Sequence, residues 1–431
     1  MEYYSTSNKN IRASFEEAVK NGIAPDHGLY MPLHIPVLTR NELEQIKINT
    51  SLSSTAYLLS KKLFGKDILE KILEELVHEA INFESPVKEV SENIYSLELF
   101  HGPTMAFKDV GARFMARILH YFNRNNTTPV NVLVATSGDT GSAVANGFLN
   151  MEGIFVHVLY PSGQVSQLQE KQFTTLGNNI RALEIDGTFD DCQALVKRAF
   201  ADETLRQKKI LTSANSINLA RLLPQSFYYF NAWSQIESEN LVFSVPSGNF
   251  GNLTAGLIAR EMGLPVNIFL AASNANDVVP EYLDTAEYKP RASVKTIANA
   301  MDVGAPSNFE RILDLYDHKH NRITKHLYGY RFSDSQIREI IKNTYESTGY
   351  ILDPHGATGY EAARKYQNSN PSSDIVFLET AHPAKFPEIV NEIIGKQVDT
   401  PERLKAFARG KKDSIKMSSE YKDFQKYLEA I

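Results

Sequence analysis

Short apolar runs alternate with helical stretches along most of this chain, and this alternation limits the fold more than any other feature. It begins after Ser85-Pro86 and continues almost to the C-terminus. Such alternation is typical of an α/β fold around a largely parallel sheet. We expect buried strands over residues 130–135, 154–160, 180–185, 241–245, 266–271 and 374–378.

The first ~85 residues differ from this pattern and are predicted to be mostly helical. Ser14 with Glu17, and Thr39 with Glu42, have the spacing of capping boxes at helix starts. We therefore expect a helical N-terminal domain at 1–85, a smaller α/β domain at 86–240 and a larger α/β domain at 241–431. The tail, rich in Lys and Ser, is expected to be solvated surface.

Composition excludes several classes of protein. The 431 residues carry a net charge of −6 and show no basic stripe, which argues against a nucleic-acid partner. The single cysteine, Cys192, allows no intramolecular disulfide and lies beside two aspartates that raise a thiol pKa. The start of the chain is polar and acidic, unlike a signal peptide, and no long uncharged apolar run suits a membrane span. We expect a cytoplasmic protein with no membrane partner.

Lys108 has an unusual setting for a lysine. A turn at His101–Thr104 leads through Met105, Ala106 and Phe107 to Lys108, which begins a helix with an apolar stripe at Phe114, Met115, Ile118, Leu119 and Phe122. The positive end of the helix dipole and partial desolvation both lower a lysine pKa. The neutral amine is then available for Schiff-base chemistry. Asp109 acts in the opposite sense and could hold the charge, and a lysine on a solvated helix face is the plain alternative.

Two strand–loop–helix units carry glycines at a predicted helix start. They are TSGDTG (Thr136–Gly141) and SGNFGN (Ser247–Asn252). Glycines allow backbone N–H groups to converge there and bind an anion. The second unit lacks the full GxGxxG of dinucleotide sites and the Lys-Ser/Thr of a P-loop. From spacing alone, a tight structural turn is an equally good interpretation.

Several stretches together resemble the threonine synthase family, which are pyridoxal-phosphate (PLP) enzymes of fold type II, the tryptophan-synthase β-like group. They are HGPTMAFKD (101–109), SANSINLARLLPQ (213–225), SGNFGN (247–252), DPHGA (353–357) and TAHPAKF (380–386). The resemblance covers nearly the whole chain. It implies two open, largely parallel sheet domains with a helical N-terminal domain. It also implies the PLP-dependent conversion of O-phospho-L-homoserine and water to L-threonine and phosphate.

The resemblance assigns roles to individual residues. Lys108 carries the cofactor and removes the substrate Cα proton; a second deprotonation at Cβ then lets phosphate leave, water adds at Cβ, and Lys108 returns as the Schiff-base partner. The Thr380 hydroxyl meets the pyridine nitrogen, and the cofactor phosphate is held by Gly248, Asn249, Phe250, Gly251 and Asn252. The implied substrate-binding residues are Thr104, Ser137, Gly138, Asp139, Thr140, Ser213, Asn215, Arg221 and Lys171. No metal site is expected, and His157, His382 and Lys385 receive no role.

Two of these assignments rest on further reasoning. Many relatives have Asn where this chain has Asp139, and an ionised carboxylate cannot donate a hydrogen bond. We therefore expect Asp139 to orient its loop rather than touch the substrate carboxylate. Arg221 is the first candidate for the substrate phosphate, with Ser213 and Asn215 as helpers, because its planar fork can grip two oxygens. Lys171 is the second candidate, and a surface or ion-pairing Arg221 is the alternative.

Two other functions remain open from the sequence. One is another fold type II lyase such as threonine dehydratase, which shares the cofactor loops but has no phosphate to bind. The other is a catalytically inactive PLP-binding homologue. The expected partner is a small-molecule substrate, and the chain is expected to act as a monomer or homodimer.

Overall fold

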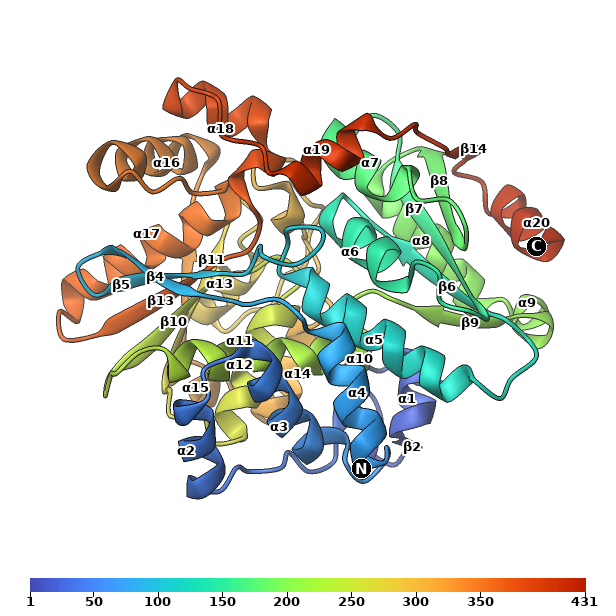
Figure 1. The fold of residues 1–431 in the computed structure, drawn as a ribbon, viewed down its shortest axis with the longest axis horizontal. Helices are drawn as coiled ribbons and strands as arrows, with labels where there is room; N and C mark the ends of the chain where they lie inside the picture. Colours follow the sequence, from blue (N-terminus) through green and yellow to red (C-terminus); the bar gives the residue numbers. More distant parts are fainter.

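The computed structural model describes residues 1–431, which form three sheets with helices packed around them (Figure 1). No helix combines the length and the apolar character needed to cross a bilayer. The predicted α/β fold with two largely parallel sheets is confirmed.

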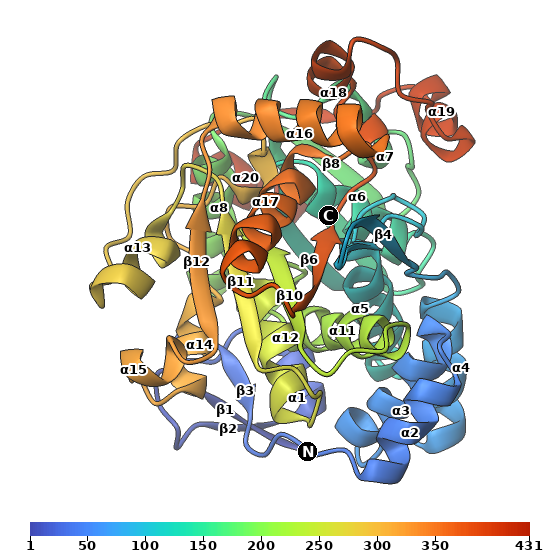
Figure 2. The same ribbon diagram turned by 90° about the vertical axis from the view of Figure 1, so that its left-hand side faces the viewer.

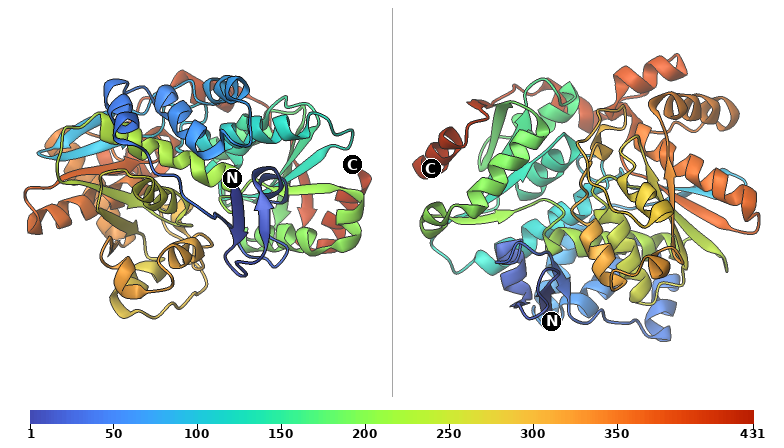
Figure 3. Two further views of the ribbon diagram at one scale, coloured as in Figure 1. Left: turned by 90° about the horizontal axis from the view of Figure 1, so that it is seen from below. Right: turned by 180° about the vertical axis from the view of Figure 1, so that it is seen from behind.

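The N-terminal segment holds a small antiparallel sheet as well as helices, and Figure 3 shows it in dark blue beside the N-terminus. The sheet consists of β1 (Glu2–Ser5), β2 (Arg12–Ser14) and β3 (Tyr30–Pro32). The helices are α1 (Phe15–Asn21), α2 (Arg40–Ile48), α3 (Leu52–Phe64) and α4 (Glu70–Ala80). Both predicted capping boxes are present, at Ser14 and Thr39. The sheet was not predicted, because strands of three or four residues carry too little alternation to be recognised.

A five-stranded sheet has the order β14-β8-β7-β6-β9, and all of its strands are parallel; in Figure 1 it is mostly green, with β14 in red at its edge. Its strands are β6 (Val130–Ala135), β7 (Ile154–Pro161), β8 (Ile180–Asp186), β9 (Ile210–Ser213) and β14 (Ile415–Ser418). Its nearby helices are α5 (Lys108–Asn123), α6 (Asp139–Phe148), α7 (Gln167–Thr174), α8 (Phe189–Ala201), α9 (Glu203–Lys208) and α20 (Tyr421–Ala430).

A six-stranded sheet has the order β12-β11-β10-β13-β5-β4 and is parallel except at the β4–β5 hairpin. Its strands are β4 (Val87–Ser91), β5 (Ile94–Glu98), β10 (Leu241–Pro246), β11 (Ile268–Ser273), β12 (Leu327–Arg331) and β13 (Asp374–Glu379). Helix α17 (Pro354–Ser369) crosses one face, as Figure 2 shows, and α12 (Gly251–Glu261) lies on the other side of the sheet.

The remaining helices connect these units. They are α10 (Leu219–Leu222), η1 (Leu223–Gln225), α11 (Ser226–Ser234), α13 (Val278–Thr285), η2 (Asn299–Met301), α14 (Phe309–Leu315), α15 (His320–Ile323), α16 (Asp334–Thr348), η3 (Pro383–Lys385), α18 (Pro387–Ile394) and α19 (Glu402–Arg409).

The sheets do not follow the domain boundaries expected from the sequence. The hairpin β4–β5 lies within 86–240, yet β5 pairs with β13 of the six-stranded sheet. The tail returns to the other sheet, where β14 pairs with β8 and α20 buries Phe424 and Leu428. The expectation of a solvated tail was therefore wrong for these residues. Pairing between strands so far apart in sequence leaves no local signal in either one.

One large apolar core connects the two main sheets. Alternate strand residues, such as Val132 and Val134 of β6 and Phe243 of β10, contribute to a single cluster of 78 buried residues. The predicted stripe of α5 is confirmed, since Phe114, Met115, Ile118 and Leu119 are buried in this cluster and Phe122 packs against it. Helix α5 is thus fixed between the sheets, with Lys108 as its first residue.

Two side chains without a predicted catalytic role, His157 and Cys192, are packed into the molecule. His157 is buried on β7, where its Nδ1 lies 3.0 Å from the Tyr427 hydroxyl and its Nε2 lies 3.1 Å from Asn131 Oδ1. Burial lowers the pKa of His157 to about 3. Burial also raises the pKa of the Cys192 thiol to about 12, which leaves it in the unreactive form.

Candidate active site

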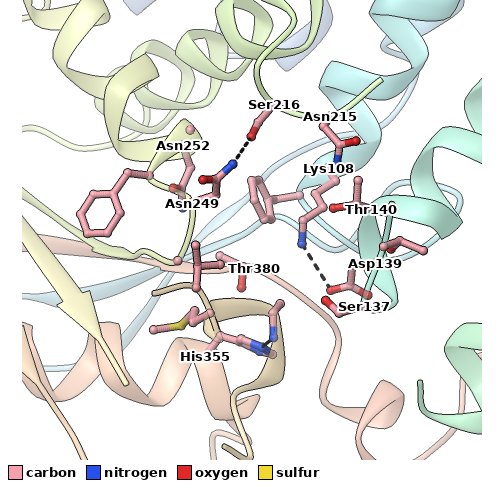
Figure 4. A pocket seen from close by; sticks show the side chains of 18 of the residues that line it. Lys108, Ser137, Asp139, Thr140, Asn215, Ser216, Asn249, Asn252, His355 and Thr380 are labelled. Carbon is pink, nitrogen blue, oxygen red and sulfur yellow. Dashed lines mark hydrogen bonds and ion pairs between the residues drawn. The ribbon is translucent and has the colours of Figure 1, made fainter. Parts of the chain in front are cut away.

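A cavity opens between the two main sheets, at the carboxyl ends of β6, β10 and β13 (Figure 4). Open α/β sheets bind their ligands at this position. The polar and glycine residues that line it include Lys108, Ser137, Asp139, Thr140, Asn215, Ser216, Arg221, Gly248, Asn249, Gly251, Asn252, His355 and Thr380. Both glycine loops that the sequence singled out therefore reach the same cavity as Lys108.

Lys108 is held at the cavity by its neighbour Phe107. The Phe107 N–H donates to Thr380 O at 2.9 Å, and the Tyr228 hydroxyl donates to Phe107 O. The Lys108 Nζ then lies 4.8 Å from the centre of the Phe107 ring and points into the cavity (Figure 4). Burial lowers the pKa of Lys108, against the opposing effect of Asp139. The helix start and the lowered pKa both agree with the sequence prediction.

Asp109 does not hold the charge of Lys108, so this alternative, which the sequence had left open, does not apply. Its carboxylate turns back and accepts from the Thr104 N–H at 2.9 Å and the Thr104 hydroxyl at 2.6 Å. Gly102 makes room for it, since a Cβ there would lie 2.4 Å from Asp109 Oδ2. The only carboxylate within 4.0 Å of Lys108 Nζ belongs to Asp139, at 3.8 Å. Asp109 instead shapes the turn that precedes the helix.

The loop at Ser247–Asn252 presents backbone donors to the cavity. Helix α12 begins at Gly251, and the N–H groups of Gly248–Asn252 have no acceptor within the protein. Phe250 has φ of 60°, in the left-handed region, so the strained residue of the loop is Phe250 rather than a glycine. Gly248 is required by close approach, since a Cβ there would lie 2.6 Å from the Met301 Cα. The unpaired donors and the helix dipole suit a phosphate group.

Thr380 follows the end of β13 and is almost fully buried at the cavity. The Thr380 carbonyl accepts a hydrogen bond from the Phe107 N–H, whereas the Thr380 hydroxyl makes no hydrogen bond to another protein atom. A free hydroxyl opposite the glycine loop can pair with a ring nitrogen of a bound molecule. No hydrogen bond from this hydroxyl to the Thr380 backbone competes with such a partner.

The loop that precedes α6 is ordered by its own residues. The Thr136 hydroxyl accepts from Gly138 N–H at 2.9 Å and from Gly141 N–H at 2.8 Å. Asp139 accepts from Gln169 Nε2 at 2.8 Å and from Lys385 Nζ at 2.5 Å. Although burial acts to raise it, Lys385 and Lys108 hold the pKa of Asp139 well below its usual range. An ionised Asp139 with these partners agrees with its predicted role of orienting the loop.

Arg221 lies at the cavity and is 2 % exposed. It forms no ion pair, so the alternative of a surface or ion-pairing arginine is wrong. The Nη1 group donates to Ala214 O at 2.5 Å, and Nε has no partner. Gly111 allows α5 to pack closely against α10, since a Cβ at Gly111 would lie 2.5 Å from Arg221 O. The result is a buried guanidinium with donors left over for a ligand, although burial lowers its pKa to about 10.

Four residues of the predicted set do not line the cavity. Thr104 is fully buried and bonds to Asp109. Gly138 has a φ of 145°, and a Cβ on it would collide with the Gln169 side chain. The Ser213 hydroxyl accepts from Asn215 N–H at 3.2 Å and so helps to fix the position of Asn215. Lys171 Nζ donates to Ala408 O at 2.6 Å and Gly410 O at 3.1 Å, away from the cavity.

Three residues at or beside the cavity received no role from sequence. The Ser216 hydroxyl accepts from Asn249 Nδ2 and Asn308 Nδ2, both at 2.9 Å, and so ties two loops together. His355 accepts from Ala300 N–H at 3.1 Å and lies 2.5 Å from Asp353 Oδ1. Lys385 reaches Asp139 from the opposite sheet. All three lie in stretches that resemble the family, so the resemblance was their only signal.

Comparison with known proteins gives a consistent match along the chain. Residues 79–381 match the family described as pyridoxal-phosphate dependent enzyme. Residues 2–81 match the threonine synthase N terminus, and residues 356–428 match the threonine synthase C-terminal family. Threonine synthase of Escherichia coli (strain K12) is 44% identical over 407 residues, which cover 94% of each chain.

Solved structures agree. The crystal structure of threonine synthase from Escherichia coli gives a TM-score of 0.93 with 42% identity and covers 100% of both chains. The structure of PLP-bound threonine synthase from Brucella melitensis gives a TM-score of 0.94 with 32% identity, covering 100% of this chain and 99% of that one. A threonine deaminase from Solanum lycopersicum, at 15% identity and a TM-score of 0.54, shares the fold alone.

Proposed function

The chain belongs to the threonine synthase family, and on that premise we propose which of its residues carry the reaction. It is a PLP-dependent lyase that converts O-phospho-L-homoserine and water to L-threonine and phosphate. The observation that carries the residue assignment is the meeting of Lys108, the glycine loop and Thr380 in one cavity.

The cavity suits PLP by its own chemistry. The unpaired N–H groups of Gly248–Asn252 at the start of α12 would hold the cofactor phosphate. The free Thr380 hydroxyl would bond the pyridine nitrogen, and Lys108 would anchor the aldehyde carbon. When bound, PLP supplies an electron sink that stabilises negative charge on the substrate carbon beside the amino group.

Lys108 moves the protons of the reaction at its Nζ atom. An amine that removes a proton must itself be neutral, and burial beside Phe107 favours the neutral form. Its place at the start of α5, held by Thr380 O and the Tyr228 hydroxyl through Phe107, fixes the direction from which Nζ enters the cavity. The same group therefore anchors the cofactor and serves as base.

The substrate is held at both of its charged ends. Ser137 and Thr140 line the cavity on the α6 side and would bind the carboxylate, while Asp139 fixes their loop. Asn215 and Arg221 line it on the α10 side and would bind the phosphate. Thr104, Gly138 and Ser213 do not line the cavity and would act through their hydrogen-bond partners, Thr104 through Asp109 and Lys385, Gly138 through Thr136, and Ser213 through Asn215. Lys171 remains a prediction from sequence that the position of its Nζ does not favour.

The buried cation distinguishes this function from that of a lyase for unphosphorylated amino acids. Arg221 is desolvated, has no carboxylate partner and keeps an unpaired Nε, a costly arrangement unless an anion completes it. A dehydratase acting on threonine has no second anion to bind. Phosphate release from O-phospho-L-homoserine, with and without added PLP, against turnover of threonine therefore tests the proposal. A protein that consumes threonine and ignores the phosphate ester would favour the dehydratase.

Replacement of Lys108 tests the assignment of the base and anchor. Lys108→Ala should abolish turnover and the visible absorption of lysine-bound PLP while the thermal unfolding of the protein remains close to wild type, because the side chain ends in the cavity rather than the core. A variant that retained the lysine-linked absorption would show that another lysine holds the cofactor. Native mass measurement would decide between the monomer and homodimer that we expect.

A further inference from the structure

Lys385 is a fully buried lysine beside the active site that the reaction described above does not use. It ends η3, six residues beyond the end of β13, within TAHPAKF. Its Nζ lies 2.5 Å from Asp139 Oδ1 and donates to Thr104 O at 2.9 Å. Lysine is almost never fully buried without a pairing of this kind.

The ion pair joins the two main sheets next to Lys108. Lys385 is carried by the end of the six-stranded sheet, and Asp139 begins a helix of the five-stranded sheet. The other oxygen of Asp139 lies 3.8 Å from Lys108 Nζ. One carboxylate thus stands between two lysines, and it is closer to Lys385 by more than an ångström.

We infer that Lys385 is a positioning residue that keeps the Lys108 amine neutral, by holding Asp139 as its own ion-pair partner. The inference rests on the proposed function of Lys108 as base. A carboxylate beside an amine favours the ammonium form, which cannot accept a proton. The charge of Lys385 offsets that of Asp139, so Lys108 lies beside a neutral pair rather than a free anion.

The other charged groups around Lys108 do not replace Lys385 as the partner of Asp139. Besides Asp139 and Lys385, the groups that act on Lys108 are Arg221 of α10 and Asp353 at the start of α17. Asp109 turns away to Thr104. The groups that stabilise the Asp139 carboxylate are the cations of Lys385 and Lys108 and the neutral amide of Gln169. Removal of Lys385 would therefore leave Lys108 as the one cation paired with Asp139.

A purely structural Lys385 would also lower activity when replaced, because the ion pair ties the sheets together. The two roles differ in what happens to the Lys108 amine. A structural role predicts weaker folding with an unchanged pH dependence. The positioning role predicts that Lys385→Met and Asp139→Asn move the titration of Lys108 in opposite directions.

The direct measurement is the pH dependence of acetic anhydride labelling of Lys108 in the cofactor-free full chain, followed by mass spectrometry. Only the neutral amine reacts. Lys385→Met should raise the midpoint by about one pH unit or more, and Asp139→Asn should lower it by a similar amount. The double variant removes both charges and should return the midpoint close to wild type. The matched control is Lys47→Met, which removes a lysine that donates to Trp233 O and Ile236 O outside the cavity.

The holoenzyme gives a second readout. The acidic limb of the kcat profile reports the base in the substrate complex, and it should move to higher pH in Lys385→Met. An unchanged labelling midpoint in folded Lys385→Met would overturn the inference, as would shifts of the same sign in both single variants. If Lys385→Met does not fold, a midpoint in Asp139→Asn at or above wild type overturns it. Labelling of Lys108 does not require turnover. If the proposed function is wrong but the inference is right, the labelling midpoints shift as expected and the protein releases no phosphate.

Discussion

Replacement of Arg221 is the sharpest test of how this chain recognises its substrate. The guanidinium is 2 % exposed, gives one hydrogen bond to Ala214 O and has no carboxylate partner. If the substrate phosphate completes its coordination, truncation removes a desolvated charge partner, which costs about 2–5 kcal/mol. At about 1.4 kcal/mol for each factor of ten, Arg221→Ala should lower kcat/KM for O-phospho-L-homoserine by about 30-fold or more.

The assay is phosphate release under steady-state conditions, with free phosphate as a competing inhibitor. Arg221→Ala should weaken inhibition by phosphate in parallel with kcat/KM, while the affinity for PLP stays close to wild type. Arg221→Lys keeps a cation but not the planar fork, so it should recover part of the loss. Lys171→Ala is the control, because its Nζ bonds to carbonyls outside the cavity and its loss should change neither quantity.

Arg221 also supports Ala214 O, so a structural contribution must be separated from phosphate binding. Loss of that hydrogen bond leaves a buried carbonyl unpaired and costs about 1–3 kcal/mol of folding free energy. A structural effect would lower thermal stability and PLP affinity without changing phosphate inhibition. Wild-type kcat/KM for O-phospho-L-homoserine in Arg221→Ala would refute the assignment, and weaker phosphate inhibition in Lys171→Ala would then favour Lys171 instead.

Two further predictions concern the cofactor loop and the buried histidine. Gly251→Val should weaken PLP binding about tenfold or more in a folded protein, because a Cβ at Gly251 already lies 3.1 Å from Ser216 Cβ and the loop must shift. Titration of the apo-protein with PLP measures it, and an unchanged affinity would mean that the loop is only a turn. In the folded protein the pKa of His157 is lowered to about 3, so its imidazole stays neutral at about pH 5. In the unfolded chain the same imidazole takes up a proton below its ordinary pKa of 6.5. The folded state therefore loses stability as the pH falls below about 6.5. His157→Gln should therefore lose less stability than wild type between neutral pH and about pH 5, by roughly 2 kcal/mol in unfolding free energy, and parallel pH curves would contradict this.

Local patterns were enough to predict the elements that carry the chemistry. Lys108 begins its helix because a turn and an apolar step precede an amphipathic stripe, and that stripe is buried as predicted. The glycine loop lies between a buried strand and a helix start for the same local reasons. Gly356, in the DPHGA stretch, is explained by a close contact in space. A Cβ there would lie 1.6 Å from the Glu379 carboxylate, so a larger residue cannot be accommodated.

Contacts between elements distant in sequence could not be predicted in this way. The sequence places Asp109 beside Lys108, and adjacency made it the natural partner for the charge. A helix turns consecutive side chains about 100° apart, however, so Asp109 points back toward Thr104 while Lys108 points into the cavity. The partner that Lys108 meets, Asp139, comes from another helix, and nothing near either residue in sequence records the contact.

The ion pair of Lys385 extends the same argument from local structure to the docking of the two sheets. Lys385 and Asp139 lie 246 residues apart in sequence, and they meet only because β13 and α6 face each other across the cavity. An ionised carboxylate at that junction would bind the Lys108 ammonium if the opposite sheet did not supply a closer cation. The chemistry of the base therefore depends on how the sheets are docked. For this reason a lysine that had no role in the sequence can set the protonation of the lysine around which the motif is built.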